Sequence, residues 1–590
     1  MQSNAEIGEE IRTNHLKPNT RKQYNAKYNV FFRWISGQQQ FQHLITNHEE
    51  KEVDLENVDG SIYTEFFGYI CRKRKRNGET IEPTVYESYE NVSGYRSALA
   101  YIHKLRGLDW NKSGHRAVGE FLGGYERKRA DLKRTGEIPL VEGKMPLNFQ
   151  SYGMLAHRTM HCTKEFELGI FGHLFLVLCW NLIARCNSVA TLLFRHISWE
   201  NDAMIVVFPS HKGDQEGRSA LPKHVFANPE NPDMCPLLAL AIFVFTIGHR
   251  REGSRPALFT TNDDEGAVES RFTKYLRSII GDNEQALLDF GLEIKDLGTH
   301  SFRKGTATYL SGMPGGPTAI AIYLRAGWSL GNVQQRYILS GDGGDQVCGR
   351  AASGLKITDP AFASLPPHFN LREGPVLSVD EWDAILPGYS TFYPNNFKPV
   401  LNYLLASLVY HQDYLAAHLT PGHPLFHQRI WRSGKLSELR GRVLAGTFVN
   451  PVSGLEATGV PPHLVIAARL VQVDAKLAAI EETLLERITQ LPGEVKKAIL
   501  DNFRVEGVIP MTHSEIEVVV SNIVERSHQR LLTAVSDMIG SRSGGSQSAI
   551  AGQETATTGQ SSLSRALAGY ATFEWGGKAH PVPEGYQFPR

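Results

Sequence analysis

The sequence has few cysteines, and none of them lie at the spacing of a metal or redox motif. Its six cysteines are scattered through 590 residues without a Cys-x-x-Cys pair. This distribution argues against a zinc module and against a disulfide framework, and it is typical of reduced thiols inside a cell. We therefore expect a protein whose fold depends on its hydrophobic core.

The chain also lacks an apolar run long enough to cross a membrane. A spanning helix needs about 20 predominantly apolar residues, whereas the longest candidates, LGIFGHLFLVLCWNLIA and LLALAIFVFTIG, are interrupted or short. We expect both to be buried core helices. The acidic, polar start MQSNAEIGEE does not have the pattern of a secretory signal. No membrane partner is expected.

An excess of positive charge is missing as well, since 62 Lys and Arg residues balance 62 Asp and Glu residues. A net charge of zero for the whole chain does not favour a nucleic-acid partner, but it can hide local basic patches. Two dense basic clusters interrupt the balance: Arg72, Lys73, Arg74, Lys75 and Arg76 form the first, and Arg127, Lys128, Arg129, Lys133 and Arg134 form the second. Either cluster is a solvated helix face or a phosphate-binding surface, and the first also fits a nuclear-import signal.

The length predicts several domains. After an N-terminal tail (1–15), residues 16–135 have apolar residues at three- and four-residue spacing, which predicts a small helical domain. A linker rich in Pro and Gly follows at 136–150. Residues 151–370 combine long apolar helices with three short strand-like runs, LLFRHISW, MIVVFPS and RSALP, separated by polar turns. This pattern predicts a mainly helical α+β domain that contains a small antiparallel sheet.

The C-terminal third has a different texture. A Pro-rich linker (371–395) precedes a helical region (396–540), in which apolar residues form a short heptad seam: Leu470, Val473, Leu477, Ile480 and Leu484. The seam fits the core of a helical bundle at least as well as a coiled coil that joins two copies. A flexible Ser/Gly/Thr-rich segment (541–562) and a short aromatic patch (563–590) complete the chain.

The stretch GTHSFRKGTATYL places His300 three residues before Arg303 at the expected start of a helix. A His-x-x-Arg pair means little by itself. Each of the other candidate residues, taken by itself, has an ordinary explanation: a helix cap, a polar turn or a core position. The set as a whole is more informative, and its members occur in this order: Arg185, Lys212, His300, Arg303, Trp328 and Tyr337.

With these six residues the chain resembles the tyrosine recombinases, the phage-integrase type, over roughly residues 16–345. The resemblance rests on a His-x-x-Arg followed by Gly-Trp and then by a Tyr nine residues later. It rests also on an Arg that precedes a small sheet with a Lys in its second hairpin. The segments GDQVCGRAASGL and FASLPPHF are similar to those that follow the tyrosine in eukaryotic recombinases of the Crypton mobile-element class.

The resemblance implies a helical core-binding domain, a recombinase catalytic domain and a chemistry without metal or other cofactor. Tyr337 would be the nucleophile that forms a 3′-phosphotyrosyl link, and Arg185 and Arg303 would clamp the phosphate. Lys212 would be the general acid, His300 would assist proton transfer, and Trp328 would contact the phosphate. The implied partners are double-stranded DNA and further copies of the chain, as a dimer or tetramer. The implied location is the nucleus, or the cytoplasm and nucleoid if the host is not eukaryotic.

The chemistry suits these residue types. A phenol has a pKa near 10, so at pH 7 about one in a thousand is ionised, and neighbouring cations can supply the roughly 4 kcal/mol that is needed. Planar guanidinium groups match the non-bridging oxygens of a phosphate. A lysine, whose pKa falls on burial, suits proton delivery to the departing oxygen.

Two other functions share these residues. A type IB topoisomerase-like enzyme would use the same chemistry as a monomer, and a non-catalytic DNA-binding protein would be a derivative that has lost it. A metal site is suggested by His157 and His161, which lie four residues apart. Because no third ligand is near them in the sequence, no metal is predicted.

Overall fold

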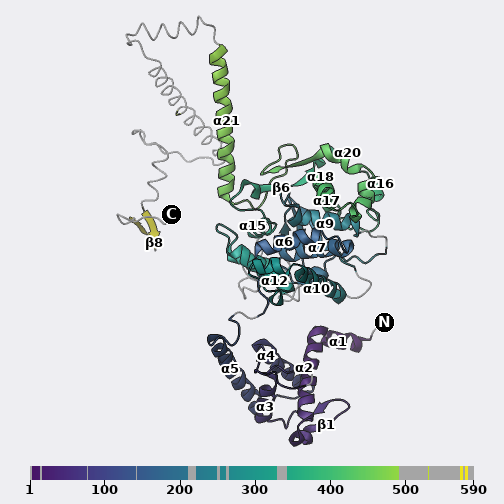
Figure 1. Ribbon diagram of the computed structural model, residues 1–590, viewed down its shortest axis with the longest axis vertical. Coiled ribbons are helices and arrows are strands. Elements are labelled where there is room, and N and C mark those ends of the chain that lie inside the picture. The colour runs from purple at the N-terminus through teal and green to yellow at the C-terminus, as the bar shows by residue number, and fades with distance from the viewer. Residues whose placement is uncertain are drawn as a thin grey trace. The chain divides into compact units, whose positions relative to one another are not determined.

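The protein is mainly helical and has small antiparallel sheets, as expected from the sequence (Figure 1). The computed structural model describes residues 3–13, 16–75, 78–140, 143–209, 221–248, 253–260, 265–328, 342–490, 529, 572–575 and 578–581. It divides into two units, Met1–Asp474 and Ala475–Arg590. None of the described helices combines the length and the apolar composition that crossing a bilayer requires.

Residues 16–135 form a helical region with a hydrophobic core of its own, rich in Phe, Tyr and Trp. Polar caps set the starts of its helices, because the side chains of Asp59, Ser88 and Asn111 accept hydrogen bonds from the first free backbone N–H groups. Helix α1 (Asn4–Thr13) precedes this region, whose elements are α2 (Pro18–Ser36), β1 (Ile45–Asn47), β2 (Glu52–Val53), α3 (Gly60–Ile70), α4 (Tyr89–Leu105) and α5 (Lys112–Arg134).

The first basic cluster does not continue a helix. Helix α3 ends at Ile70, and the chain that follows is extended, with bridges from Arg72 to Tyr86 and from Arg74 to Thr80. The apolar spacing stops at Ile70, and a run of like charges provides no apolar face that could hold a further helical turn against the core. The cluster is therefore part of a short paired segment between α3 and α4.

Residues 147–439 share one hydrophobic core. Helices α7 and α9 are apolar around their whole circumference and are buried, as expected, and α6, α10 and α17 pack against them (Figure 1). The helices are α6 (Phe149–Met160), α7 (Phe166–Asn181), α8 (Cys186–Ala190), α9 (Pro236–Thr246), α10 (Glu265–Asp282), α11 (Glu284–Asp289), α12 (Thr299–Ser311), α13 (Ala319–Ala326), α15 (Asp342–Ala352), α16 (Val379–Ile385), α17 (Lys398–Tyr410), α18 (Gln412–His418), α19 (Arg429–Arg432) and α20 (Lys435–Leu439).

The linker expected at 371–395 is thus not a boundary in the structure. It contains α16, and apolar side chains from 369 to 439 join the same core as those from 147 to 302. Pro and Gly in this segment end short helices that are packed on the core. Residues 371–439 complete the central domain.

A three-stranded antiparallel sheet lies in this domain, as predicted, in the order β3 (Ile197–Glu200), β4 (Ala203–Val206) and β5 (Lys223–Val225). A two-residue turn at Asn201 and Asp202 joins β3 to β4, and Val206 of β4 pairs with Lys223 of β5. The third strand begins after RSALP, the run in which we expected it. Residues 210–220 of this connection lie outside the described residues.

Two glycines permit close contacts around the segment that carries His300 and Arg303. A β-carbon at Gly305 on α12 would collide with the backbone of Leu147, and one at Gly349 on α15 would collide with the carbonyl of His224 on β5. Only glycine lets α12 approach the backbone at Leu147, and α15 the backbone at His224, so closely.

A buried ion pair ties the sheet to the segments beyond α15. The Arg350 guanidinium is fully buried, bonds to the Asp202 carboxylate, and donates to the carbonyls of Thr458, Phe362 and Ser364. Strand β6 (Ser364–Phe369) in turn pairs antiparallel with β7 (Val443–Thr447). One arginine on α15 therefore holds three separate parts of the chain.

Helix α21 (Pro462–Gln490) carries the expected heptad seam. Leu470, Val473 and Ile480 are exposed, while the side chain of Leu484 lies outside the described residues. The Ser/Gly/Thr-rich segment at 541–562 also lies outside them. Within the C-terminal patch, β8 (Thr572–Trp575) and β9 (Lys578–Pro581) form a hairpin.

Candidate active site

Helix α7 ends in a tight left-handed turn that presents Arg185. The Ile183 N–H donates to the carbonyl of Trp180 and the Ala184 N–H to that of Cys179, which is the Schellman pattern. Glycine is usual at the left-handed position, but here it is Ile183, with φ of 47°. A β-branched residue in this conformation costs on the order of 1–3 kcal/mol, so the surroundings must hold it.

Helix α13 ends in the same way and presents Trp328. The Gly327 N–H donates to the carbonyl of Leu324 and the Trp328 N–H to that of Tyr323. Gly327 occupies the left-handed position, with φ of 62°. The two helix ends thus place Arg185 and Trp328 directly after equivalent turns.

Arg303 and Lys223 each bridge the two helix ends. The Arg303 guanidinium, from α12, donates to the carbonyls of Ile183 (2.6 Å) and Ala326 (2.5 Å). The Lys223 ammonium, from β5, donates to the carbonyls of Leu182 (3.4 Å) and Arg325. Helix C-termini carry partial negative charge, which these two buried cations offset. The bond from Arg303 also fixes the carbonyl of the strained Ile183.

Arg325 and Asp345 brace this arrangement. Arg325 is buried, donates to the last carbonyl of α7, that of Asn181 (2.8 Å), and forms an ion pair with Asp345 of α15 (2.7 Å). Asp345 also accepts from the backbone N–H of His224 (2.7 Å). Three successive carbonyls, at 181, 182 and 183, therefore each accept from a different cation.

The positive charges in this cluster act on one another. Burial and the nearby charge of Arg185 lower the pKa of Arg303 to about 10, and burial lowers that of Arg185. His300 lies at the surface. Partial burial and the charges of Arg185, Arg303 and Lys304 lower its pKa. His300 is therefore neutral near pH 7 and can accept a proton.

Lys223 has the most perturbed cationic side chain of the cluster. Burial, and then the charge of Arg325, lower its pKa to about 7, although Asp345 acts in the opposite direction. An ammonium group with this pKa can both hold and release a proton at neutral pH.

The cluster carries more positive charge than the carboxylates around it balance. It contains Arg185, Arg303, Arg325 and Lys223, whereas Asp345 is the carboxylate that bonds to it among the described residues. Moving a charge into a protein interior is costly unless an opposite charge accompanies it. The site is thus suited to an anion with several oxygen atoms, such as a phosphate.

A hollow of about 430 Å³, with a largely apolar wall and basic side chains among its residues, adjoins the cluster at His300. Of the residues that the structure describes, its wall includes the basic Lys144, Arg277, Lys295 and His300 and has no acidic member, although Lys295 forms an ion pair with the neighbouring Glu293. Lys144 and Lys295 are on the surface of the same domain, where a phosphate backbone could reach them.

The structure brings together four of the six residues singled out in the sequence. Arg185, His300 and Arg303 interact electrostatically, and the Arg303 guanidinium lies 5.5 Å from the centre of the Trp328 ring. Lys212 and Tyr337 lie outside the described residues. Their positions remain predictions.

Sequence reasoning missed Lys223, Arg325 and Asp345. One signal was present for Arg325, which is the sole charged residue of the apolar stretch AIAIYLRA. A charge inside an apolar helix that stays buried needs a partner from elsewhere in the fold. The partner, Asp345, stands 20 residues later, and no local pattern connects the two.

The basic clusters of the helical region are only partly available to DNA. Lys73, Lys75, Arg127 and Lys128 are exposed. Arg129, in contrast, is buried and its guanidinium donates to the carbonyl of Glu87, which differs from the phosphate contact expected of it.

The other five residues of the two clusters differ in their surroundings. Arg74 stacks on the Tyr69 ring, 3.8 Å from its centre. Arg72 and Arg134 are exposed, Lys133 is partly buried, and Arg76 lies outside the described residues.

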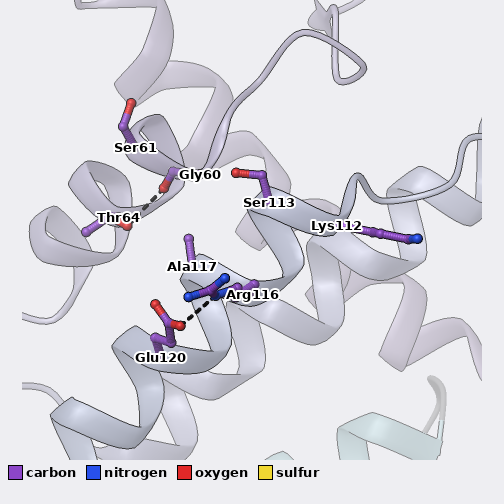
Figure 2. Close-up of a pocket in the computed structure, with 8 residues that line it drawn as sticks. All are labelled: Gly60, Ser61, Thr64, Lys112, Ser113, Arg116, Ala117 and Glu120. Carbon is purple, nitrogen blue, oxygen red and sulfur yellow. Dashed lines mark hydrogen bonds and ion pairs between the residues drawn. The ribbon is translucent and has the colours of Figure 1, made fainter.

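A polar hollow of about 450 Å³ lies between the starts of α3 and α5 (Figure 2). Ser61 and Thr64 come from α3, while Lys112 and Arg116 come from α5. The Arg116 guanidinium is paired with Glu120 at 2.8 Å, so the hollow offers hydroxyl groups and little net charge. Sequence reasoning had not marked this surface.

No protein-family model and no curated protein sequence matches the chain. Among solved structures, the chain is similar to a mutant Flpe in a complex with a DNA Holliday junction, with a TM-score of 0.30 and 10% sequence identity. The similarity covers 68% of this chain and 98% of that chain. We base the function on the side chains described above rather than on this likeness.

Proposed function

We propose that the protein is a site-specific DNA recombinase that cleaves and rejoins strands through a 3′-phosphotyrosyl intermediate. The observation that carries the proposal is the position of Arg303. Its guanidinium is fixed to two helix ends, beside the two residues, Arg185 and Trp328, that those ends present. A guanidinium has five N–H donors, so Arg303 can keep both carbonyl bonds and still bind a phosphate.

In the proposed reaction, the Tyr337 oxygen attacks the phosphorus of the scissile linkage and the bond to the 5′-oxygen breaks. The phenol proton passes to His300, whose lowered pKa keeps it able to accept. Lys212 gives a proton to the departing oxygen. Arg185 and Arg303 hold the non-bridging oxygens, where a preorganised donor is worth on the order of 3–4 kcal/mol. Rejoining reverses each step, so the phosphotyrosyl bond retains the energy.

The DNA partner is proposed from two places on the surface where basic side chains gather. One is the hollow beside His300, and the other comprises Lys73, Lys75, Arg127 and Lys128 of the helical region. Contacts to phosphates release counterions, so affinity should fall steeply with salt. The resemblance to the Crypton class extends the proposal to a mobile element that acts in a nucleus.

Assembly is the part of the proposal that separates recombination from topoisomerase-like relaxation. Leu470, Val473 and Ile480 leave an exposed apolar seam on α21, and a heptad seam is buried when two such helices pair. We propose that copies of the chain associate through this helix. Sedimentation of wild type against Leu470→Glu tests it, and identical monomeric behaviour of both would contradict it.

The decisive experiment uses a nicked duplex in which the cleaved fragment diffuses away. A covalent protein–DNA adduct, formed in the presence of EDTA, is the expected result. No adduct with wild type on the element's own terminal DNA would favour a non-catalytic DNA-binding protein. Adducts accompanied by plasmid relaxation from monomers, without strand exchange, would favour a topoisomerase.

A further inference from the structure

The structure supplies the third ligand that the sequence lacked for His157 and His161. His157 lies on α6, His161 directly follows it, and Asp233 belongs to the short helix η3 (Pro232–Met234), far away in sequence. The Asp233 carboxylate oxygens lie 2.8 Å from His157 Nδ1 and 3.0 Å from His161 Nε2. One ligand atom from each of the three residues lies within 4.8 Å of the other two.

These spacings fit a single small ion. Zinc binds imidazole nitrogen and carboxylate oxygen at about 2.0–2.2 Å with tetrahedral angles. Two such ligand atoms are then roughly 3.3 Å apart. The two nitrogen–oxygen distances, one to each oxygen of the Asp233 carboxylate, are a few tenths of an ångström shorter. Small side-chain rotations would open the gap.

The hydrogen bonds of His161 show that its contact with Asp233 needs a positive charge. His161 Nδ1 lies 3.2 Å from the carbonyl oxygen of His418, which can only accept, so Nδ1 must carry a hydrogen. In the neutral ring, Nε2 then directs a lone pair at a carboxylate oxygen that is also an acceptor. The contact is favourable only with a cation bound to both atoms, or with a second proton on the ring.

The surroundings resemble the outer shell of a metal site. A backbone carbonyl that orients a ligating histidine through its other nitrogen is the usual arrangement. The Tyr414 hydroxyl donates to Asp233 Oδ1 at 2.9 Å and orients the carboxylate in the same manner. Both outer partners, Tyr414 and the carbonyl of His418, come from α18 or its end.

We propose that His157, His161 and Asp233 bind a divalent zinc-like ion, with water in the fourth position, that ties α6 and η3 to α18. The His157 side chain is 52% exposed, so an ion and a water molecule can enter from solvent, whereas those of His161 and Asp233 are 16% and 17% exposed. Two imidazoles and one carboxylate suit Zn²⁺ rather than Mg²⁺ or Ca²⁺, which prefer oxygen ligands. The ion would fasten α18 to the α6 and η3 region within the central domain.

The role is structural and separate from strand cleavage. The described contacts of the three ligands do not include Arg185, His300, Arg303 or Trp328. Removing the ion should lower the melting temperature of the full chain, while adduct formation persists well below that temperature.

The test is titration of chelator-treated full-length protein with Zn²⁺ by calorimetry, together with thermal melting. We expect one ion per chain and a higher melting temperature, since an ion that binds the folded state stabilises it. His157→Gln should weaken binding about 100-fold or more, because losing even an outer-shell partner costs 10–100-fold. His43→Gln, at an exposed histidine of the helical region, should change nothing.

Co²⁺ provides a second readout that does not depend on stability. Visible absorption bands of a tetrahedral Co²⁺ complex should form with wild type and be absent from Asp233→Asn whose circular dichroism is that of the folded protein. Equal Zn²⁺ affinity in wild type and His157→Gln would overturn the proposal. So would a His161 ring that NMR shows to be doubly protonated and insensitive to Zn²⁺, because the contact would then be an ion pair.

Discussion

Arg303 and Lys223 bind the same pair of helix ends, one residue apart on each. Arg303 donates to the carbonyls of 183 and 326, and Lys223 to those of 182 and 325. Two elements far apart in sequence, α12 and β5, thereby hold the turns that present Arg185 and Trp328. The fold places its buried cations where they stabilise helix termini. The positive charge of the same cations favours binding of an anion.

Arg303 both stabilises the fold and is proposed to bind the phosphate. Arg185 is proposed only to bind the same phosphate, so their variants should differ in stability. Arg303→Ala removes two carbonyl hydrogen bonds, so we expect the free energy of unfolding to fall by about 1–3 kcal/mol as adduct formation falls about 100- to 1,000-fold. Arg185→Ala should slow adduct formation by a similar factor with a stability change within about 0.5 kcal/mol, since the Arg185 side chain makes no hydrogen bond to the described residues. Urea unfolding and single-turnover trapping measure the two effects, and equal stability losses would contradict the distinction.

The nucleophile can be assigned with two conservative variants. Tyr337→Phe removes only the attacking oxygen, so the adduct should disappear while DNA affinity, which depends on phosphate contacts, stays nearly unchanged. Tyr323→Phe is the matched control, because Tyr323 is exposed and its ring packs against Trp328 at 5.0 Å. An adduct with Tyr337→Phe that is lost with Tyr323→Phe would reassign the nucleophile.

Lys223 should make stability depend on pH in a direction that can be worked out. Its pKa is about 7 in the folded protein and 10.5 when unperturbed, so between these values the unfolded chain binds more protons. The free energy of unfolding therefore rises with pH in this window, by at most about 1.4 kcal/mol per unit. Urea unfolding at pH 7 and pH 9 should show this rise in wild type and a smaller one in Lys223→Met. Parallel behaviour of the two proteins would show that Lys223 does not titrate there.

The activity profile should reflect His300 on the acid side. If His300 accepts the phenol proton, adduct formation under kcat/KM conditions falls as pH drops through the pKa of the free enzyme. That pKa is lowered by partial burial, Arg185, Arg303 and Lys304, so the fall should begin below the ordinary histidine value of about 6.5. His300→Gln should slow the reaction and remove this acid limb. A limb that persists in the variant belongs to another group.

Local patterns predicted the elements of the site better than their assembly. The helix that begins near His300 and the buried helices α7 and α9 were expected from the sequence and are present. The turn at Ile183 carries no such signal, because its left-handed conformation is held by Arg303 from 120 residues away. The contact of the histidine pair with Asp233 could not be predicted either, since Asp233 approaches His161 across 72 residues. Long-range contacts of this kind are fixed by the core and leave no local period.

Either Lys212 or Lys223 could be the general acid, and a modified substrate distinguishes the two. A sulfur in place of the bridging 5′-oxygen leaves readily without a proton, so it should restore cleavage only where the missing group is the acid. Lys212→Ala should therefore be slow on ordinary DNA and close to wild type on the 5′-phosphorothiolate. Lys223→Met should remain slow on both substrates, because Lys223 is bound to the carbonyls of Leu182 and Arg325 and positions the helix ends. Rescue of Lys223→Met, with Lys212→Ala unrescued, would transfer the acid role to the buried lysine, whose pKa of about 7 already suits it.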